Sequence, residues 1–187
     1  MPNVLVPIAD GTEEIEAVTI IDVLRRAGAE VTVAAVGDPP GGMITASRGV
    51  RIVADCPIAH CVGEVFDLIA LPGGMPGAER LRDSPELTGL LTGQKAAGRS
   101  LAAICAAPAV VLDAHGLIDG GRATAHPAFF DRLPADRTSE EGVVIDGECI
   151  TSRGPGTAIS FALTLVKILF DEETAREIGR AMVVDGW

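Results

Sequence analysis

The sequence predicts an open α/β sandwich built on a mostly parallel sheet. Apolar runs of β type alternate with longer stretches of helical periodicity, and each of these runs is almost continuously apolar instead of alternating with polar residues. Strands of this kind are typical of a parallel sheet that is covered on both faces by crossover helices. The predicted strands are residues 3–8, 30–36, 67–74 and 100–105, and the predicted helices between and after them are residues 13–28, 84–98 and 108–116.

The C-terminal part changes pattern. Two short alternating runs within residues 142–152 meet at Asp146-Gly147, which is a strong hairpin signal. An antiparallel pair is therefore expected beside or at an edge of the parallel sheet. Pro155 suits the first turn of a long helix, and a last helix is expected from about 172 to 182. The long helix carries an apolar stripe at helical spacing: Ile159, Leu163, Val166 and Phe170.

Length, charge and cysteine content limit the class of protein. A chain of 187 residues fits one domain, residues 1–187. The formal charge of −11 and the low aromatic content of 3% argue against nucleic acid as a ligand. Apolar runs fall short of the ~20 residues that a membrane span needs, and no basic segment precedes the first run. The four cysteines form no C-x-x-C pair, so we expect free thiols, a reducing cytoplasm and no membrane association.

Cys105 ends the apolar stretch "LAAIC", where a predicted strand gives way to a helix. Unpaired cysteine is often a small buried hydrophobe, and composition alone supports that interpretation. Position supports a reactive thiol instead, because ligands of parallel sheets bind beyond the carboxyl ends of strands. Pro108 favours an early helical position, and a helix N-terminus stabilises a thiolate by about 0.3–1 kcal/mol. On that interpretation the thiol pKa should lie below its usual value.

Glu16 falls inside the apolar stripe of the helix predicted at residues 13–28, whereas Glu14 is expected on the opposite side. A buried carboxylate is costly, and the usual relief is a raised pKa that keeps the group protonated. The alternative is that Glu13, Glu14 and Glu16 merely favour a helix N-terminus behind a Thr12 cap, which suits Glu13 and Glu14 better. The other members of the stripe are Ile20, Val23, Leu24 and Ala27.

The two anomalies belong together, because this helix begins at the edge of the sheet that should also carry Cys105. A protonated Glu16 could donate a hydrogen bond to a thiolate or act as general acid and base on a bound carbonyl. His126, in "ATAHPAFF", could orient or activate the cysteine, although a lone histidine is more often a satisfied structural residue. The sequence leaves both roles of His126 open.

The glycines of "LPGGMPGAERL" match neither phosphate-loop motif. They indicate a tight strand exit, whose amides at Gly73 and Gly74 could stabilise an oxyanion beside the cysteine, or else a plain turn. Arg153 precedes a helix N-terminus and could contact an anion or a subunit. The spacing of Cys56, His60 and Cys61 matches no standard zinc pattern, so no metal is expected.

Taken in order, five segments resemble the ThiJ/PfpI superfamily: "GTEEIEAV", "LPGGMPGA", "AAICAAP", "AHP" and "TSRGPGTA". The resemblance covers essentially the whole chain and is to the branch of the parkinsonism-associated deglycase (DJ-one) and bacterial YajL-type proteins. It implies a flavodoxin-like three-layer sandwich, that is, one domain related to class I glutamine amidotransferases, and a homodimer.

The resemblance also implies roles for individual residues. Cys105 would be an oxidation-prone nucleophile, Glu16 a protonated acid beside it, and His126 a neighbour of the site. Two departures stand out: Ala107 replaces a glycine of some relatives, and Ala106 replaces the histidine of the proteolytic branch, which argues against protease activity. The remaining implied residues are the oxyanion-binding amides of Gly73, Gly74 and Ala106 and the dimer or anion contacts Arg48 and Arg153.

Two functions follow from these residues. The first is conversion of methylglyoxal or glyoxal to 2-hydroxy acids without glutathione, metal or organic cofactor, through a hemithioacetal on Cys105 with Glu16 as acid and base. The alternative is a redox-sensing stress protein or chaperone that acts through oxidation of Cys105 to a sulfinic acid. A structural sandwich with an inert thiol is a third interpretation.

Overall fold

The computed structural model describes residues 1–118 and 121–187. Its main feature is a seven-stranded sheet in which every neighbouring pair is parallel except the last, β9 with β8. The predicted α/β class is confirmed. In spatial order the strands are β5 (Cys56–Pro57), β2 (Glu30–Ala35), β1 (Asn3–Ile8), β6 (Leu68–Leu71), β7 (Ser100–Ile104), β9 (Cys149–Ser152) and β8 (Val143–Asp146).

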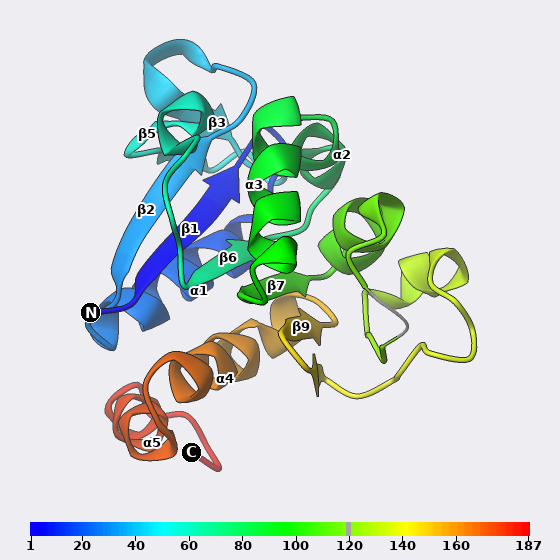
Figure 1. Ribbon diagram of the computed structural model, residues 1–187. Coiled ribbons are helices and arrows are strands. Elements are labelled where there is room, and N and C mark those ends of the chain that lie inside the picture. Colours follow the sequence, from blue (N-terminus) through cyan, green and yellow to red (C-terminus); the bar gives the residue numbers. More distant parts are fainter. Residues whose placement is uncertain (119–120) are drawn as a thin grey trace.

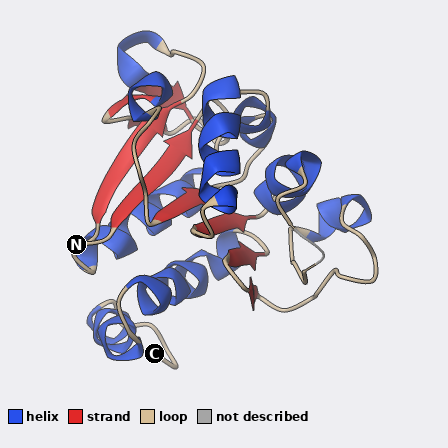
Figure 2. Cartoon of the chain, viewed as in Figure 1, coloured by secondary structure: helices blue, strands red, loops and turns tan. Residues whose placement is uncertain are grey.

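Helices cover both faces of this sheet (Figure 1). One face carries α1 (Glu14–Arg26) and α4 (Ala158–Leu169), with α5 (Glu172–Ala181) packed against α4. The opposite face carries α2 (Gly77–Arg82), α3 (Pro85–Ala96) and the segment that follows β7. The three layers are clear in Figure 2, where the red strands lie between the blue helices.

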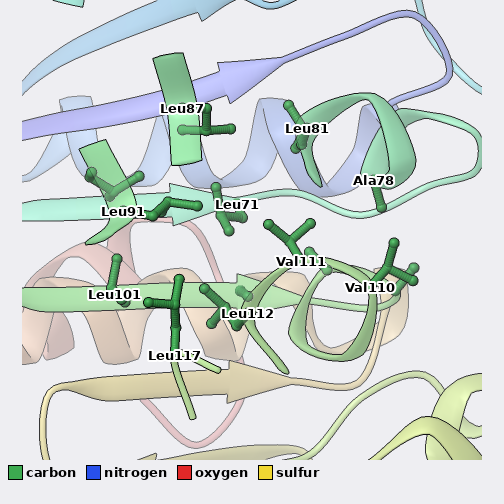
Figure 3. Packing of buried hydrophobic residues seen from close by; sticks show 14 of the residues in the cluster. Leu71, Ala78, Leu81, Leu87, Leu91, Leu101, Val110, Val111, Leu112 and Leu117 are labelled. Carbon is green, nitrogen blue, oxygen red and sulfur yellow. The ribbon is translucent and has the colours of Figure 1, made fainter. Parts of the chain in front are cut away.

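Alternation along the strands divides the core between the two faces. In β1, Val4 and Val6 contribute to the cluster under α1 and α4, whereas Leu5 contributes to the cluster on the other side. All three side chains are fully buried, as expected for a central parallel strand. Figure 3 shows the second cluster, in which leucines of β6, β7, α2 and α3 meet the segment after β7: Leu71, Leu81, Leu87, Leu91, Leu101, Val111 and Leu112.

The predicted hairpin is present as β8 and β9, joined at Gly147-Glu148, with β8 at the edge of the sheet. Other details differ from the sequence-based expectation. The helix predicted at residues 108–116 is a π-helix, Pro108–Leu112, followed by a 3₁₀ turn, Asp113–His115. Ile159 is 42% exposed, because α4 buries the face that carries Phe161 and Leu165.

Several short elements were not predicted. They are α2, β5 and a separate two-stranded antiparallel ribbon, β3 (Met43–Thr45) with β4 (Arg51–Val53). Elements of two to six residues are too short to show a period in the sequence. None of the described helices is long and apolar enough to cross a membrane.

The strand order places the site. Strands β1, β6 and β7 are parallel neighbours, so their carboxyl ends lie side by side at one edge of the sheet. The chain leaves β1 toward α1, leaves β6 through Gly73 and Gly74, and leaves β7 at Cys105. Three segments that are far apart in sequence therefore converge at this edge.

Candidate active site

Cys105 occupies a strained turn between β7 and the π-helix. Its φ of +65° lies in the left-handed region, which is uncommon for a residue with a side chain. Two backbone hydrogen bonds fix it: Cys105 N–H donates to the carbonyl of Ser152 at 3.0 Å, and its own carbonyl accepts from His126 N–H at 2.8 Å. The side chain is 8% exposed. A strained strand-to-helix turn that is held by its neighbours is a typical way to present a nucleophile.

Glu16 lies in the first turn of α1 and is fully buried, as predicted. The helix cap differs from the expectation, since Glu13 is the N-cap residue and its Oε2 accepts from Glu16 N–H at 2.8 Å. The Thr12 hydroxyl instead accepts from Ala9 N–H at 2.9 Å, so Thr12 ties the strand exit and not the helix. The Glu13 cap therefore fixes the backbone from which the Glu16 side chain projects.

Gly73 connects Glu16 to Cys105. Its N–H donates to Glu16 Oε2 at 2.8 Å. A Cβ at Gly73 would lie 2.7 Å from Cys105 Cβ, which is closer than two such atoms can approach, so the position requires glycine. Glu16 Oε1 is buried and has no hydrogen-bond partner among the described residues. This oxygen is therefore available to carry or receive a proton.

The predicted oxyanion-binding amides divide into two groups. The N–H of Gly73 is taken by Glu16, so it is not a free donor for an oxyanion, contrary to the sequence-based expectation. The backbone groups of Gly74 and Ala106 act on Cys105, where their hydrogen bonds favour the thiolate. Two amides thus remain to stabilise negative charge at the sulfur or on an atom bonded to it.

The thiol pKa is raised, and the expectation of a lowered value is wrong. Burial and then the charge of the neighbouring Glu16 carboxylate raise the pKa of Cys105 to about 12, against the opposing effect of Gly74 and Ala106. The short π-helix at Pro108–Leu112 does not compensate. Burial also raises the pKa of Glu16 to about 7, against the opposing hydrogen bond of Gly73 and the interaction with Cys105.

These two groups titrate as a pair. Their first proton is lost near neutral pH and the second only in strong base. In the singly ionised pair the remaining proton can reside on sulfur or on the Glu16 carboxyl. Amides of Gly74 and Ala106 favour charge on sulfur, whereas the amide of Gly73 favours charge on the carboxylate. The site can therefore present a thiolate beside a carboxylic acid without any change in net charge.

His126 contributes its backbone to the site, through the N–H that donates to Cys105. Its side chain caps a 3₁₀ helix, Pro127–Arg132, by accepting from Ala128 N–H at Nδ1, 3.2 Å away. The ring lies against Gly154 and helps to line a pocket of about 290 Å³ together with Arg153. His126 therefore holds the turn at Cys105 through its backbone N–H. Its catalytic role stays a prediction.

The two arginines lie in different places. Arg153 lines the same pocket as His126, donates from Nη1 to the carbonyl of Glu140 at 3.0 Å and stacks over the Phe130 ring at 5.7 Å. Arg48 has an exposed side chain, and its backbone N–H donates to Glu14 Oε1 at 2.8 Å. Among the described residues, no group of three or more His, Cys, Asp or Glu side chains is placed to hold a metal ion.

Sequence reasoning missed Ser152, and it named His126 for its side chain and not for its backbone. Both residues hold the turn at Cys105 through backbone atoms, which leave no signal in residue type. It also missed that Glu14 is buried, at 8% exposure, under Ser47 and Arg48. The covering residues are distant in sequence, so the pattern around Glu14 gave no signal of this burial.

Comparisons with known proteins show what this chain is similar to. Residues 2–168 match the model of the DJ-1/PfpI family. Protein DJ-1 homolog A of Arabidopsis thaliana is 46% identical over 97% of this chain, which spans only 46% of that relative. The glutathione-independent glyoxalase DJR-1.2 of Caenorhabditis elegans is 37% identical over 94% of this chain and 91% of its own.

A solved structure, oxidized DJ-1 of Toxoplasma gondii, superposes with a TM-score of 0.96 at 50% identity, covering 99% of this chain and 100% of that one. The predicted flavodoxin-like sandwich and the predicted family are thereby confirmed. This chain belongs to the DJ-1/PfpI family.

Proposed function

We propose that residues 1–187 act as one ThiJ/PfpI-type domain that converts small dicarbonyls such as methylglyoxal to 2-hydroxy acids without glutathione. The observation that carries this proposal is Glu16, a fully buried acid with a pKa near 7 and one unpaired oxygen, next to a cysteine in a strained turn. A group with this pKa exchanges protons in both directions at neutral pH. The name of the nematode relative, a glutathione-independent glyoxalase, supports the same chemistry.

The first step is addition of the Cys105 sulfur to the aldehyde, after the thiol proton has passed to the Glu16 carboxylate. The thiolate attacks the aldehyde carbon, the carbonyl π electrons move to oxygen, and Glu16 returns the proton, which converts this oxygen to a hydroxyl. The product is a hemithioacetal. Amides of Gly74 and Ala106, which face the sulfur, stabilise the negative charge that moves from sulfur to oxygen.

Proton transfer between the two carbons follows. The Glu16 carboxylate removes the hydrogen of the former aldehyde carbon as a proton, which leaves an enediolate. Glu16 returns this proton to the adjacent carbon, while the hydroxyl proton of the former aldehyde carbon passes to the oxygen of the adjacent carbon. This makes a thioester of a 2-hydroxy acid. Water hydrolyses the thioester and restores the Cys105 thiol. One substrate carbon is oxidised and its neighbour reduced, so the net reaction consumes only water and needs no external redox partner.

Turnover of methylglyoxal to lactate tests this proposal, with chiral chromatography of the product. Native protein should form many equivalents of one lactate enantiomer, and Cys105→Ala should fall to the uncatalysed background because the covalent intermediate cannot form. Cys149→Ala is the matched control, since Cys149 is also buried but lies in β9 away from the elbow. Consumption of about one equivalent of methylglyoxal, with formation of a stable adduct, would contradict an enzymatic role.

A homodimer is part of the same proposal. Apolar side chains on α1 and β4 are exposed, among them Ile15 at 55%, Val18 at 48% and Val53 at 64%. Val18 and Val53 line one shallow pocket on this face. Arg48, which is exposed and lies between β3 and β4, donates its backbone N–H to Glu14 of α1. A contiguous apolar face bordered by charge is typical of a subunit interface. Sedimentation should show a dimer for the native protein and a monomer for Val18→Glu.

Redox sensing is the second candidate function. The relative from Toxoplasma gondii was solved in an oxidized form, and Cys105 combines some exposure with two amides directed at its sulfur. Those amides would stabilise a sulfinate, and a protonated Glu16 could donate to it. Addition of two oxygen atoms to Cys105 after mild peroxide would support this function. An unmodified Cys105 would contradict it.

A further inference from the structure

Two cysteines lie close together at the opposite edge of the sheet from β8. The Sγ atoms of Cys56 and Cys61 are 3.8 Å apart. Cys56 belongs to β5, the edge strand, which is separated from the Cys105 strand by β2, β1 and β6. This pair therefore shares no element with the candidate active site, and the proposed dicarbonyl chemistry makes no use of it.

The local fold holds the two sulfurs together. The strand β5 pairs with β2 through Cys56 and Ala34, which fixes the first cysteine, and a 3₁₀ helix, Ile58–Cys61, brings the second one back. Ile58 is 6% exposed and anchors this turn in the core. A disulfide requires a sulfur separation near 2.05 Å, so closure brings the two Sγ atoms about 2 Å closer together.

The two cysteines differ in accessibility. Cys56 is half-buried, whereas Cys61 is only 2% exposed. Burial and then the neighbouring Cys56 raise the pKa of Cys61 to about 12, so Cys61 keeps its proton at neutral pH. An accessible sulfur backed by a buried thiol is the usual arrangement of an attacking cysteine and a resolving cysteine.

We propose that Cys56 and Cys61 form a reversible intramolecular disulfide in response to hydrogen peroxide, at a redox site separate from Cys105. The Cys56 thiolate attacks one peroxide oxygen, the O–O bond breaks, and the released hydroxide takes a proton to become water. Cys61 sulfur then attacks the sulfur of the Cys56 sulfenic acid, and the hydroxyl leaves with the Cys61 proton as a second water. Two thiols lose two electrons in total, and one peroxide molecule gains them.

Tryptic mass spectrometry tests this directly, because the three relevant sites separate into different peptides. Cleavage after arginine places Cys56 and Cys61 together in residues 52–80, Cys105 in residues 100–122 and Cys149 in residues 138–153. After mild peroxide and alkylation of free thiols, the peptide 52–80 should be lighter than its reduced form by two hydrogen atoms and should carry no alkyl group. Dithiothreitol should restore both alkylation sites.

Variants assign the roles. Cys61→Ala should abolish the lighter peptide and leave a sulfenic acid on Cys56 that dimedone traps, while Cys56→Ala should leave Cys61 reduced. Cys105→Ala and Cys149→Ala should form the disulfide as the native protein does. The proposal is overturned if native peptide 52–80 stays fully alkylatable under peroxide, if Cys56 gains oxygen while Cys61 remains free, or if the bond forms between two chains on a non-reducing gel.

Discussion

Two glutamates in the first turn of α1, Glu14 and Glu16, have pKa values that are shifted in opposite directions. Glu14 and Glu16 are both buried, at 8% and 0% exposure. Both carboxylate oxygens of Glu14 are paired, with Ser47 Oγ at 2.7 Å and Arg48 N–H at 2.8 Å. Glu16 Oε2 accepts from Gly73 N–H and the carboxyl group interacts with Cys105, whereas Oε1 has no hydrogen-bond partner among the described residues.

The depth of burial and the hydrogen-bond partners together decide the direction of the pKa. Burial acts to raise the pKa of Glu14, but hydrogen bonds from Ser47 and from backbone amides outweigh it and lower the pKa. Burial prevails at Glu16 and raises its pKa to about 7. Glu14 is therefore a permanent charge that ties the β3–β4 connection to α1, whereas Glu16 is available for proton transfer. Hydrogen-bond satisfaction, and not burial alone, separates a structural acid from a reactive one.

The largest expected difference is in turnover. Glu16→Gln removes the group that moves the proton between substrate carbons, so kcat for methylglyoxal should fall by about 10²–10⁴-fold. Glu14→Gln should leave kcat unchanged, since Glu14 faces Ser47 and Arg48. Steady-state kinetics on both variants measure the contrast. Equal losses of kcat in the two variants would contradict the proposed difference between Glu14 and Glu16.

The pH dependence of stability gives the next largest difference. The Glu16 carboxyl titrates near 4.5 in the unfolded chain and near 7 in the folded protein. Between these values the folded protein holds the extra proton, so its stability falls as pH rises, by about 3 kcal/mol once pH exceeds the folded pKa. Urea unfolding at about pH 5 and about pH 8 should show this fall in native protein and not in Glu16→Gln. A native protein without the fall would contradict a raised Glu16 pKa.

A third expectation concerns the glycine that partners Glu16. An added Cβ at Gly73 would meet Cys105 Cβ at 2.7 Å and the Ile104 carbonyl at 2.8 Å, so Gly73→Ala should destabilise the fold by about 1–3 kcal/mol and reduce turnover. Gly89→Ala in α3 is the matched control, because nothing lies within 4 Å of its added Cβ. The control should be neutral or up to ~1 kcal/mol more stable. Denaturant unfolding compares the two, and equal stabilities would refute the close packing.

The smallest expected effect belongs to Glu14. Glu14→Gln replaces a charged acceptor of two hydrogen bonds, so stability should fall by about 1 kcal/mol at neutral pH. The extra stability of the native protein over Glu14→Gln is present above the unfolded pKa of 4.5. It is lost as pH falls through the lowered pKa of Glu14 in the folded protein. Urea unfolding of both proteins at several pH values measures this. A difference that grows on acidification would have the wrong sign for a paired carboxylate.

Particular residues show what the sequence could and could not predict. The burial of Glu16 followed from its place in a helical stripe, and the position of Cys105 followed from the end of an apolar strand. Both depend on local periodicity, which a single sequence records. The four longer strands and the hairpin were predictable for the same reason, whereas β3, β4 and β5 are too short to show a period.

What escaped prediction depends on contacts between distant segments. Glu14 is covered by Ser47 and Arg48, more than thirty residues later in the chain, so no pattern around Glu14 announces its partners. The raised pKa of Cys105 depends on its burial and then on Glu16, which arrives from another strand exit. The use of the Gly73 amide by Glu16 has the same origin. Tertiary placement of charges decides these properties, and local signals such as a helix N-terminus do not.

Titration of Glu16 is the direct test of whether this acid carries a proton beside Cys105 at neutral pH. Carboxyl-carbon NMR on protein with isotope-labelled glutamate, assigned with Glu14→Gln and Glu16→Gln, follows both acids through the same pH series. We expect a midpoint near 7 for Glu16 and a midpoint below the ordinary 4.5 for Glu14. A Glu16 midpoint at or below 4.5 would mean a carboxylate that is ionised at all working pH values, and would contradict its role as proton carrier beside Cys105.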